Sequence, residues 1–232
     1  YPQDENFMEL FLIIKNLKDI GADKVKAVIP YLGYSRQDKR FKPGEAVSVK
    51  IIAELLEAAG ADEVFSINLH EHNIIKFFNI PAYELSAIPL LAEHLSSRVD
   101  DPIIIAPDKG ALDHAKTMAE IIGCEYDYME KVRISPEKVE TRLKNFNVEG
   151  RSAIIVDDII STGGTIVNAS RILHSQGAMD IKVVCVHPVL VNDALLRIFS
   201  TGVEEVIATD TIKSEVSIVS VAPLIAEALK ED

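Results

Sequence analysis

The chain is short of cysteine and of positive charge. Its 232 residues include only two cysteines, and 24 Lys and Arg stand against 36 Asp and Glu, giving a formal net charge of −12. This acidic balance disfavours nucleic acid or an anionic membrane surface as the main partner, because phosphate groups would be repelled. Any phosphate-binding site must therefore be local.

Long apolar runs and a cysteine framework are lacking as well. Cys124 and Cys185 lie far apart in apolar sequence, which is typical of buried, reduced thiols and not of a disulfide or a metal pair. The apolar stretch 181–191 is interrupted by His187 and Pro188, and no secretory signal pattern occurs. These features predict a cytoplasmic protein that has no membrane partner.

What the sequence does contain is a regular alternation of strand and helix patterns. Its length and its 48% of hydrophobic residues are sufficient for two moderate cores. Four predicted helices end at a glycine: Gly21, Gly60, Gly123 and Gly177. The pattern predicts an α/β fold of two tandem domains, each a mainly parallel sheet with helices on both faces.

The predicted elements fall on either side of a boundary near Pro81 and Pro89. Residues 1–84 and 85–232 would form the two domains, with the last helix available to pack on the first. The charged segment 132–150 is long for a connection and is predicted to form a lid. The predicted helices are 6–20, 48–59, 90–97, 111–122, 165–175, 193–201 and 222–230, and the strands are 25–30, 63–68, 103–106, 126–131, 152–156, 181–186 and 205–209. Since the chain starts without Met and enters a helical pattern at once, we expect a preceding N-terminal segment.

The most informative motif follows the predicted strand 152–156. Asp157 and Asp158 stand at its carboxyl end, where ligands bind in open α/β sheets, and the loop 161–165 leads into a helix. Amides, hydroxyls and the helix N-terminus can converge on a phosphate, whereas two carboxylates suit vicinal hydroxyls or hydrated Mg²⁺. The predicted phosphosugar site comprises Asp157, Asp158, Ser161, Thr162, Gly163, Gly164 and Thr165.

A simpler interpretation is a strand-loop-helix connection with a capping Thr and no ligand. Two carboxylates that leave a buried strand beside hydroxyls and glycines are costly without a partner, which favours the site. A Walker A loop is excluded, because no Gly-Lys-Ser/Thr follows. The segment resembles the phosphoribosyl-pyrophosphate loop of type I phosphoribosyltransferases, which implies that loop 161–165 holds a ribose 5-phosphate.

A second motif narrows this resemblance. Residues 31–40 read Tyr-Leu-Gly-Tyr-Ser-Arg-Gln-Asp-Lys-Arg after a strand end, and Arg36 and Gln37 have the chemistry to bind a phosphate and a purine edge. Alone, the segment is also compatible with a solvated charged loop. Together with loop 161–165 it resembles the ribose-phosphate pyrophosphokinase family, the phosphoribosyl-pyrophosphate synthetases. The resemblance implies that ATP is bound by Arg36, Gln37 and Asp38.

Two further segments match that family. His70 follows Asn68-Leu69 at a strand end and matches the family's metal-associated histidine, although Asn68 stands where Asp is usual. Asp108-Lys109-Gly110 follows strand 103–106 and resembles the pyrophosphate-binding loop, although Ala111 stands where a second Gly is frequent. The resemblance implies that His70 and Asp108 hold Mg²⁺, that Asn68 only supports the site by hydrogen bonding, and that the pyrophosphate loop is Asp108, Lys109 and Gly110.

Lys131 and Arg133 open the long segment 132–150. They alternate, so on an extended chain both would project to one side. The resemblance places them on a flexible loop that closes over ATP and stabilises the transition state. The implied catalytic residues are Lys131, Arg133 and His70.

The implied reaction converts ATP and ribose 5-phosphate to 5-phosphoribosyl 1-pyrophosphate and AMP, with Mg²⁺ as cofactor. The family also implies a homo-oligomer, at least a dimer. Two alternatives remain open from the residues: a base-specific phosphoribosyltransferase, and a non-catalytic or truncated homologue. The remaining histidines receive no role.

Overall fold

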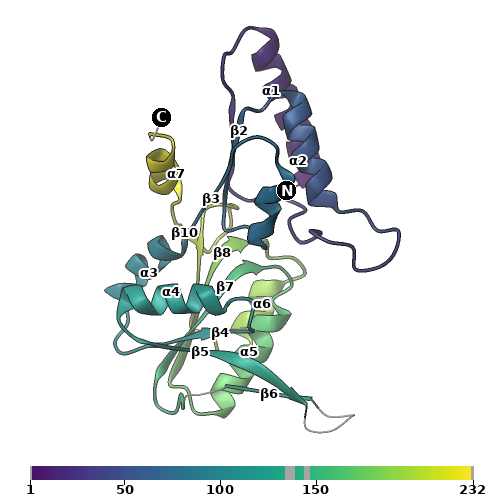
Figure 1. Cartoon of the computed structure of the whole chain (residues 1–232). Coiled ribbons are helices and arrows are strands. Elements are labelled where there is room, and N and C mark those ends of the chain that lie inside the picture. The colour runs from purple at the N-terminus through teal and green to yellow at the C-terminus, as the bar shows by residue number, and fades with distance from the viewer. Residues whose placement is uncertain (1, 134–138, 144–146, 231–232) are drawn as a thin grey trace. The chain divides into compact units, whose positions relative to one another are not determined.

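The computed structural model describes residues 2–133, 139–143 and 147–230. The chain forms two compact units, Tyr1–Ser86 and Ala87–Asp232, each with its own sheet (Figure 1). Within the described residues, no helix combines the length and the apolar character needed to cross a bilayer.

The first unit is a parallel sheet of three strands in the order β1-β2-β3. The helices α1 and α2 lie side by side, and their apolar faces join the strands in one core with Phe7, Ile14, Leu56 and Ile74 (Figure 1). The elements are α1 (Gln3–Asp19), β1 (Lys26–Ile29), α2 (Ser48–Ala59), β2 (Glu63–Ile67), the 3₁₀ helix η1 (His72–Phe77) and β3 (Ala82–Leu85).

The second unit is a seven-stranded sheet in the order β10-β9-β8-β7-β4-β5-β6. All neighbouring strands are parallel except β5 and β6. The strands are β4 (Ile103–Ala106), β5 (Glu125–Arg133), β6 (Val139–Leu143), β7 (Ser152–Ile160), β8 (Asp180–Pro188), β9 (Glu205–Thr209) and β10 (Ser217–Val219). The helices are α3 (Ile88–Ser96), α4 (Leu112–Ile122), α5 (Gly164–Ser175), α6 (Ala194–Phe199) and α7 (Ala222–Ala228).

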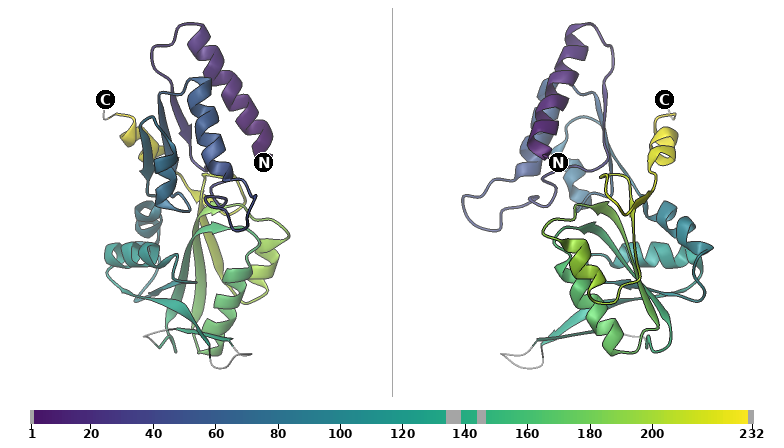
Figure 2. Two further views of the ribbon diagram at one scale, coloured as in Figure 1. Left: turned by 45° about the vertical axis from the view of Figure 1, so that its right-hand side comes forward. Right: turned by 180° about the vertical axis from the view of Figure 1, so that it is seen from behind.

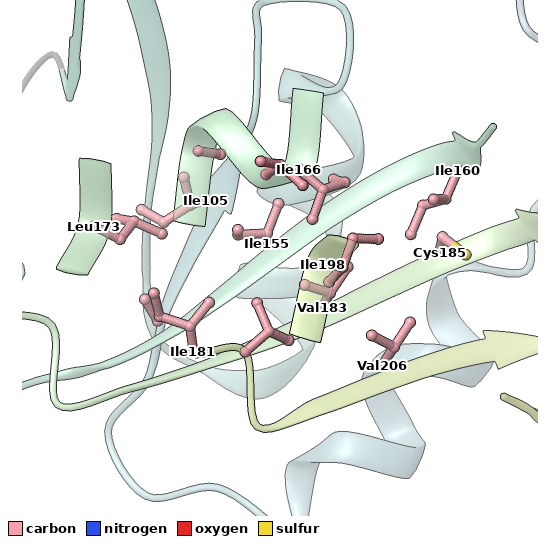
Figure 3. Packing of buried hydrophobic residues seen from close by; sticks show 14 of the residues in the cluster. Ile105, Ile155, Ile160, Ile166, Leu173, Ile181, Val183, Cys185, Ile198 and Val206 are labelled. Atoms are coloured by element: carbon pink, nitrogen blue, oxygen red, sulfur yellow. The ribbon is translucent and has the colours of Figure 1, made fainter. Parts of the chain in front are cut away.

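Helices cover both faces of this sheet, with α3 and α4 on one face and α5 and α6 on the other (Figure 2). Under α5 and α6, branched side chains of the central strands form a closely packed layer, including Ile105, Ile155 and Val183 (Figure 3). Each of these three side chains is fully buried. The predicted α/β class is thereby confirmed, as are the four helix-ending glycines, which all have a left-handed φ.

Two differences from the predicted elements bear on the site. The strand β7 runs four residues beyond its predicted end, because its pairing with β8 continues to Ile160, opposite Pro188. The predicted connection 132–150 instead contains part of β5 and the strand β6, which pair as an antiparallel hairpin. Both extensions carry charged residues, so the local sequence has low strand propensity and long-range pairing decides the structure.

Candidate active site

The candidate site of the second unit lies where β4 and β7 end. The chain continues from β4 to β5 on one side of the sheet and from β7 to β8 on the other, so the two strands flank a topological switch point. The pairing of β4 with β7 stops at Ile155, whereas β8 follows β7 further. Asp157 and Asp158 therefore lie on a part of β7 that has lost its neighbour on the β4 side. Asp108, two residues beyond β4, stands at the same edge.

The carboxylates at this edge repel one another. Asp157 is half-buried, and its pKa lies well above the ordinary value, first because the group loses solvent and second because Asp158 and Asp108 add negative charge. The Oδ1 atom of Asp157 accepts a hydrogen bond from the amide of Asp158 at 3.0 Å. This bond lowers the pKa of Asp157, but by less than burial and the neighbouring charges raise it. Hydroxyl donors or a cation would relieve the repulsion.

A thiol lies next to these carboxylates. Cys185 stands opposite Asp157 in the register of β7 and β8 and is fully buried. Burial, and then the charges of Asp157 and Asp158, raise the pKa of the Cys185 thiol well above its ordinary value. The group is neutral at physiological pH and is no nucleophile. Cys124 is also a free cysteine, as predicted.

Beyond β7, the loop 161–165 enters α5 through a glycine. Gly163 is the N-cap residue with φ of 73°, and no side chain caps the helix. A Cβ atom at Gly163 would lie 3.1 Å from Cδ1 of Ile198 on α6. The site therefore requires glycine at this position and leaves the first amides of α5 available to an anion.

Two contacts in the second unit could not be predicted from the sequence. Nη1 of Arg197 donates to the carbonyl oxygen of Thr162 at 3.0 Å, and the buried His187 lies within hydrogen-bonding distance of Thr211, with 2.9 Å between Nδ1 and Oγ1. Arg197 is 35 residues from Thr162 in the chain, so local sequence gave no signal. A histidine within the apolar strand pattern 181–188 was the only indication of a buried polar network.

At this edge of the second unit, the candidate ligands for a metal ion are all carboxylates. No set of three His, Cys, Asp or Glu side chains forms a metal site within the described part of the chain. Mg²⁺ commonly keeps several waters and is bound through one or two carboxylates together with substrate phosphates. Asp108 together with Asp157 or Asp158 would be sufficient for an ion of that kind, which would also reduce the repulsion.

In the first unit, His70 follows β2 and its side chain is exposed. The chain before it is tied to β3, because the amide of Asn68 donates to the Leu85 carbonyl at 2.9 Å and the amide of Leu69 donates to Oε1 of Glu84 at 2.8 Å. Asn68 is buried and has a φ of 38°, which is uncommon for a residue other than glycine. The backbone that presents His70 is thus well defined.

The second candidate segment of this unit is the loop 31–46, in which the side chain of Gln37 bonds to the backbone of two other loop residues. The side-chain amide nitrogen of Gln37 donates to the carbonyl oxygens of Lys39 at 3.1 Å and Ala46 at 3.3 Å. Gln37 therefore shapes the loop in this conformation, and its amide hydrogens are already engaged. Arg36 is exposed and Asp38 is half-buried beside it.

Lys131 and Arg133 lie on β5, where their backbones pair with Thr141 and Val139 of β6. Their side chains and residues 134–138 lie outside the described residues. The predicted lid therefore stays a prediction.

Comparison with known proteins gives a consistent result over the whole chain. A family model described as the N-terminal domain of ribose phosphate pyrophosphokinase matches residues 1–60, and a phosphoribosyl transferase domain matches residues 75–198. A ribose-phosphate pyrophosphokinase of Methanothermobacter thermautotrophicus is 67% identical over 231 residues, which span all of this chain and 81% of the relative. One of Methanobrevibacter smithii is 49% identical, over all of this chain and 82% of the relative.

A solved structure agrees with these relatives. The crystal structure of phosphoribosylpyrophosphate synthetase from Mycobacterium smegmatis superposes with a TM-score of 0.86 at 31% identity, covering 99% of this chain and 78% of that one. Both domains of the family are matched in order, and the motifs of loop 161–165 and of Asp108 lie at one edge of the sheet. The chain therefore belongs to the ribose-phosphate pyrophosphokinase family.

Proposed function

We propose that the protein transfers the pyrophosphoryl group of ATP to the C1 hydroxyl of ribose 5-phosphate, giving 5-phosphoribosyl 1-pyrophosphate and AMP. The observation that carries this proposal is the match of relatives named for this activity over the entire chain. The base-specific transferase is less well supported, because residues 1–60 match a domain named for the pyrophosphokinases.

The acceptor sugar fits the edge formed by β7. Asp157 and Asp158 would accept charge-assisted hydrogen bonds from the 2′ and 3′ hydroxyls, which suit carboxylates that repel one another. The 5-phosphate would be bound by the uncapped start of α5 and the loop before it. The binding residues we propose there are Ser161, Thr162, Gly163, Gly164 and Thr165.

The donor nucleotide would be held by several loops. Arg36 and Asp38 would contact ATP, with Gln37 keeping their loop closed, and Asp108, Lys109 and Gly110 would bind the pyrophosphate. The amide of Gly110 already donates to Oδ1 of Asp108 at 2.8 Å, which fixes that carboxylate at the start of the loop. Asp108 in the second unit and His70 in the first are each proposed as a residue that binds Mg²⁺, which neutralises phosphate charge when bound.

The reaction needs no covalent enzyme intermediate. The C1 oxygen of the sugar attacks the β-phosphorus of ATP and its proton passes to solvent, while the bond from that phosphorus to the oxygen shared with the α-phosphorus breaks, releasing AMP. Binding both substrates in line supplies much of the rate enhancement. Lys131 and Arg133 would stabilise negative charge that develops on the transferred group.

A mass-resolved assay of ATP, ribose 5-phosphate and Mg²⁺ tests this function. We expect equal amounts of AMP and phosphoribosyl pyrophosphate, and we expect Lys131→Ala to lower kcat by about 10²-fold or more while calorimetric binding of ribose 5-phosphate stays nearly unchanged. Release of ADP in place of AMP, or no turnover by the wild type, would contradict the activity. Equal turnover of the variant would remove the role of Lys131.

We also propose a homo-oligomer. Three apolar side chains of α1 are exposed to solvent by half or more. Their relative exposures are 59% for Met8, 65% for Leu12 and 50% for Ile13. A cluster of this kind on one helix is typical of an association surface. The free, partly or fully buried thiols of Cys124 and Cys185 fit a reducing compartment such as the cytoplasm.

A further inference from the structure

The backbone of the predicted phosphate loop is bound by a segment that follows β8. The amide of Leu190 donates to the Ile160 carbonyl at 2.9 Å, and the amide of Val191 donates to the Ser161 carbonyl at 3.1 Å. These bonds continue past the last ladder pair, in which Ile160 stands opposite Pro188. We call residues 190–198 the buttress segment.

A side chain of the same segment binds the next carbonyl oxygen of the loop. Arg197, on α6, donates from Nη1 to the carbonyl of Thr162 at 3.0 Å. Three successive carbonyl oxygens, those of residues 160, 161 and 162, are therefore all bound by the buttress segment. The first two bonds come from backbone amides, and only the third depends on a side chain.

The direction of these carbonyls determines the direction of the amides that follow them. A peptide group is planar and trans, so the N–H of one residue points opposite to the C=O of the residue before it. The amides of Ser161, Thr162 and Gly163 consequently point away from the buttress segment. Successive amides that share a side of the chain form an anion-binding concavity, and here they adjoin the free amides of the uncapped start of α5.

The buttress segment has the properties of a firm support. Leu190, Asn192 and Asp193 have left-handed φ values of 50°, 55° and 55°. Asn and Asp adopt this conformation comparatively readily, whereas Leu keeps it only when its surroundings enforce it. Ile198 is fully buried in the core layer that also contains Val183 (Figure 3). A Cβ atom at Gly163 would lie 3.1 Å from Cδ1 of Ile198, closer than an ordinary van der Waals contact.

We propose that Arg197 is a positioning residue for ribose 5-phosphate. By binding the Thr162 carbonyl it fixes the Thr162–Gly163 peptide, so that the Gly163 amide is directed at the 5-phosphate before the substrate arrives. This inference rests on the proposed function, in which loop 161–165 takes that phosphate. Arg197 itself does not contact the substrate.

The test is steady-state kinetics of Arg197→Met, with Arg171→Met as the matched control. Arg171 is an exposed arginine of α5, about two helical turns beyond the loop. For Arg197→Met we expect KM for ribose 5-phosphate to rise about tenfold, with KM for ATP and kcat within about threefold of the wild type. Arg197→Lys should recover part of the loss, because an ammonium group can still donate to the carbonyl. Arg171→Met should match the wild type.

Calorimetric binding of ribose 5-phosphate separates this inference from the proposed function. If the wild type binds the sugar phosphate but forms no AMP, the function fails, and a weaker affinity of Arg197→Met still supports positioning. The inference is overturned if Arg197→Met keeps the wild-type KM and affinity, or if KM for ATP rises as much as KM for ribose 5-phosphate. Thermal melts of every variant establish that assays are run well below unfolding.

Discussion

Asp157 is held where its ionised form is disfavoured. Its raised pKa means that the folded protein keeps the proton to a higher pH than the unfolded chain, whose carboxyl titrates near 3.8. Between these two pKa values the native state binds more protons, so the free energy of unfolding falls as the pH rises. The carboxylate thus lowers stability at neutral pH, a cost that fits the sugar-binding role proposed for Asp157.

We therefore expect Asp157→Asn to raise the Tm by about 2–4 °C near neutral pH and to weaken ribose 5-phosphate binding by about tenfold or more. The amide oxygen of Asn can still accept from the Asp158 backbone, so the loop should keep its structure. The gain in Tm should shrink as the pH is lowered toward the ordinary carboxyl pKa. Thermal melts across this pH range and calorimetry measure both effects.

The control for Asp157→Asn is Asp100→Asn, since Asp100 is an exposed aspartate of the same unit. It should leave the Tm unchanged at every pH. A lower Tm of Asp157→Asn at neutral pH would contradict the charge environment described for Asp157.

At the level of residues, the composition of the candidate site could be predicted from the sequence, but the electrostatics around Asp157 could not. Asp157, Asp158 and loop 161–165 could be found because carboxylates, hydroxyls and glycines follow a buried strand within a few positions. The influence of Asp108 on the pKa of Asp157, and the bond from Arg197, depend on contacts between distant parts of the chain. Such contacts leave no periodicity in the sequence.

Among the elements, α5 begins at two neighbouring glycines that have different structural requirements. Gly163 has a positive φ, and an added Cβ atom would meet Ile198 at 3.1 Å. Gly164 is helical, and an added Cβ atom would have Thr162 Oγ1 as its nearest neighbour, at 3.8 Å. The first position demands glycine, whereas the second tolerates a methyl group.

We expect Gly163→Ala to lower the free energy of unfolding by about 2 kcal/mol or more, because strain in φ and crowding against Ile198 add. Gly164→Ala should leave it unchanged or raise it by up to about 1 kcal/mol, since Ala is the better helix former. Equilibrium unfolding in urea compares the two variants. Equal stability of the pair would show that α6 yields to the extra methyl group and does not constrain the loop.

The bounds of a strand could be predicted from the sequence where the strand contains a buried apolar run. The strands β4 and β9 have their predicted bounds, because Ile103–Ala106 is a short apolar run and Glu205–Thr209 has one at its centre, as is typical of strands that parallel sheets bury. The strands β3, β6 and β10 were missed, since they are short or polar and are specified by their partners. For the same reason the charged end of β7 was predicted to be a loop.

For the molecule as a whole, the exposed apolar side chains of α1 predict that copies of the chain associate through this helix. We expect Leu12→Glu to lower the sedimentation coefficient at micromolar concentration, because a charge would be buried at the interface. Glu is a good helix former, so α1 should remain helical. The control is Met179→Glu, whose parent side chain is 67% exposed in the second unit. If both variants sediment like the wild type, α1 is not the association surface.

The fold class could be predicted from the alternation of strands and helices, but the order of the strands could not. The pattern requires parallel sheets, and both sheets are mainly parallel. The strand β7 lies beside β4, and this neighbourhood creates the switch point and brings Asp157 near Asp108. The position of β7 depends on how the second unit packs its helices on the two faces of the sheet. No single segment encodes that choice.

If loop 161–165 binds the 5-phosphate as proposed, the buttress segment makes that recognition largely a task of the main chain. Peptide amides do not titrate at physiological pH, and a substitution that keeps the local conformation does not remove them. The contribution of the phosphate to affinity should therefore follow the ionisation of the substrate, whose second phosphate pKa is about 6, and not that of loop 161–165. Side chains at Ser161 and Thr165 would then be free to vary among relatives without loss of the phosphate, while the support behind the loop would not.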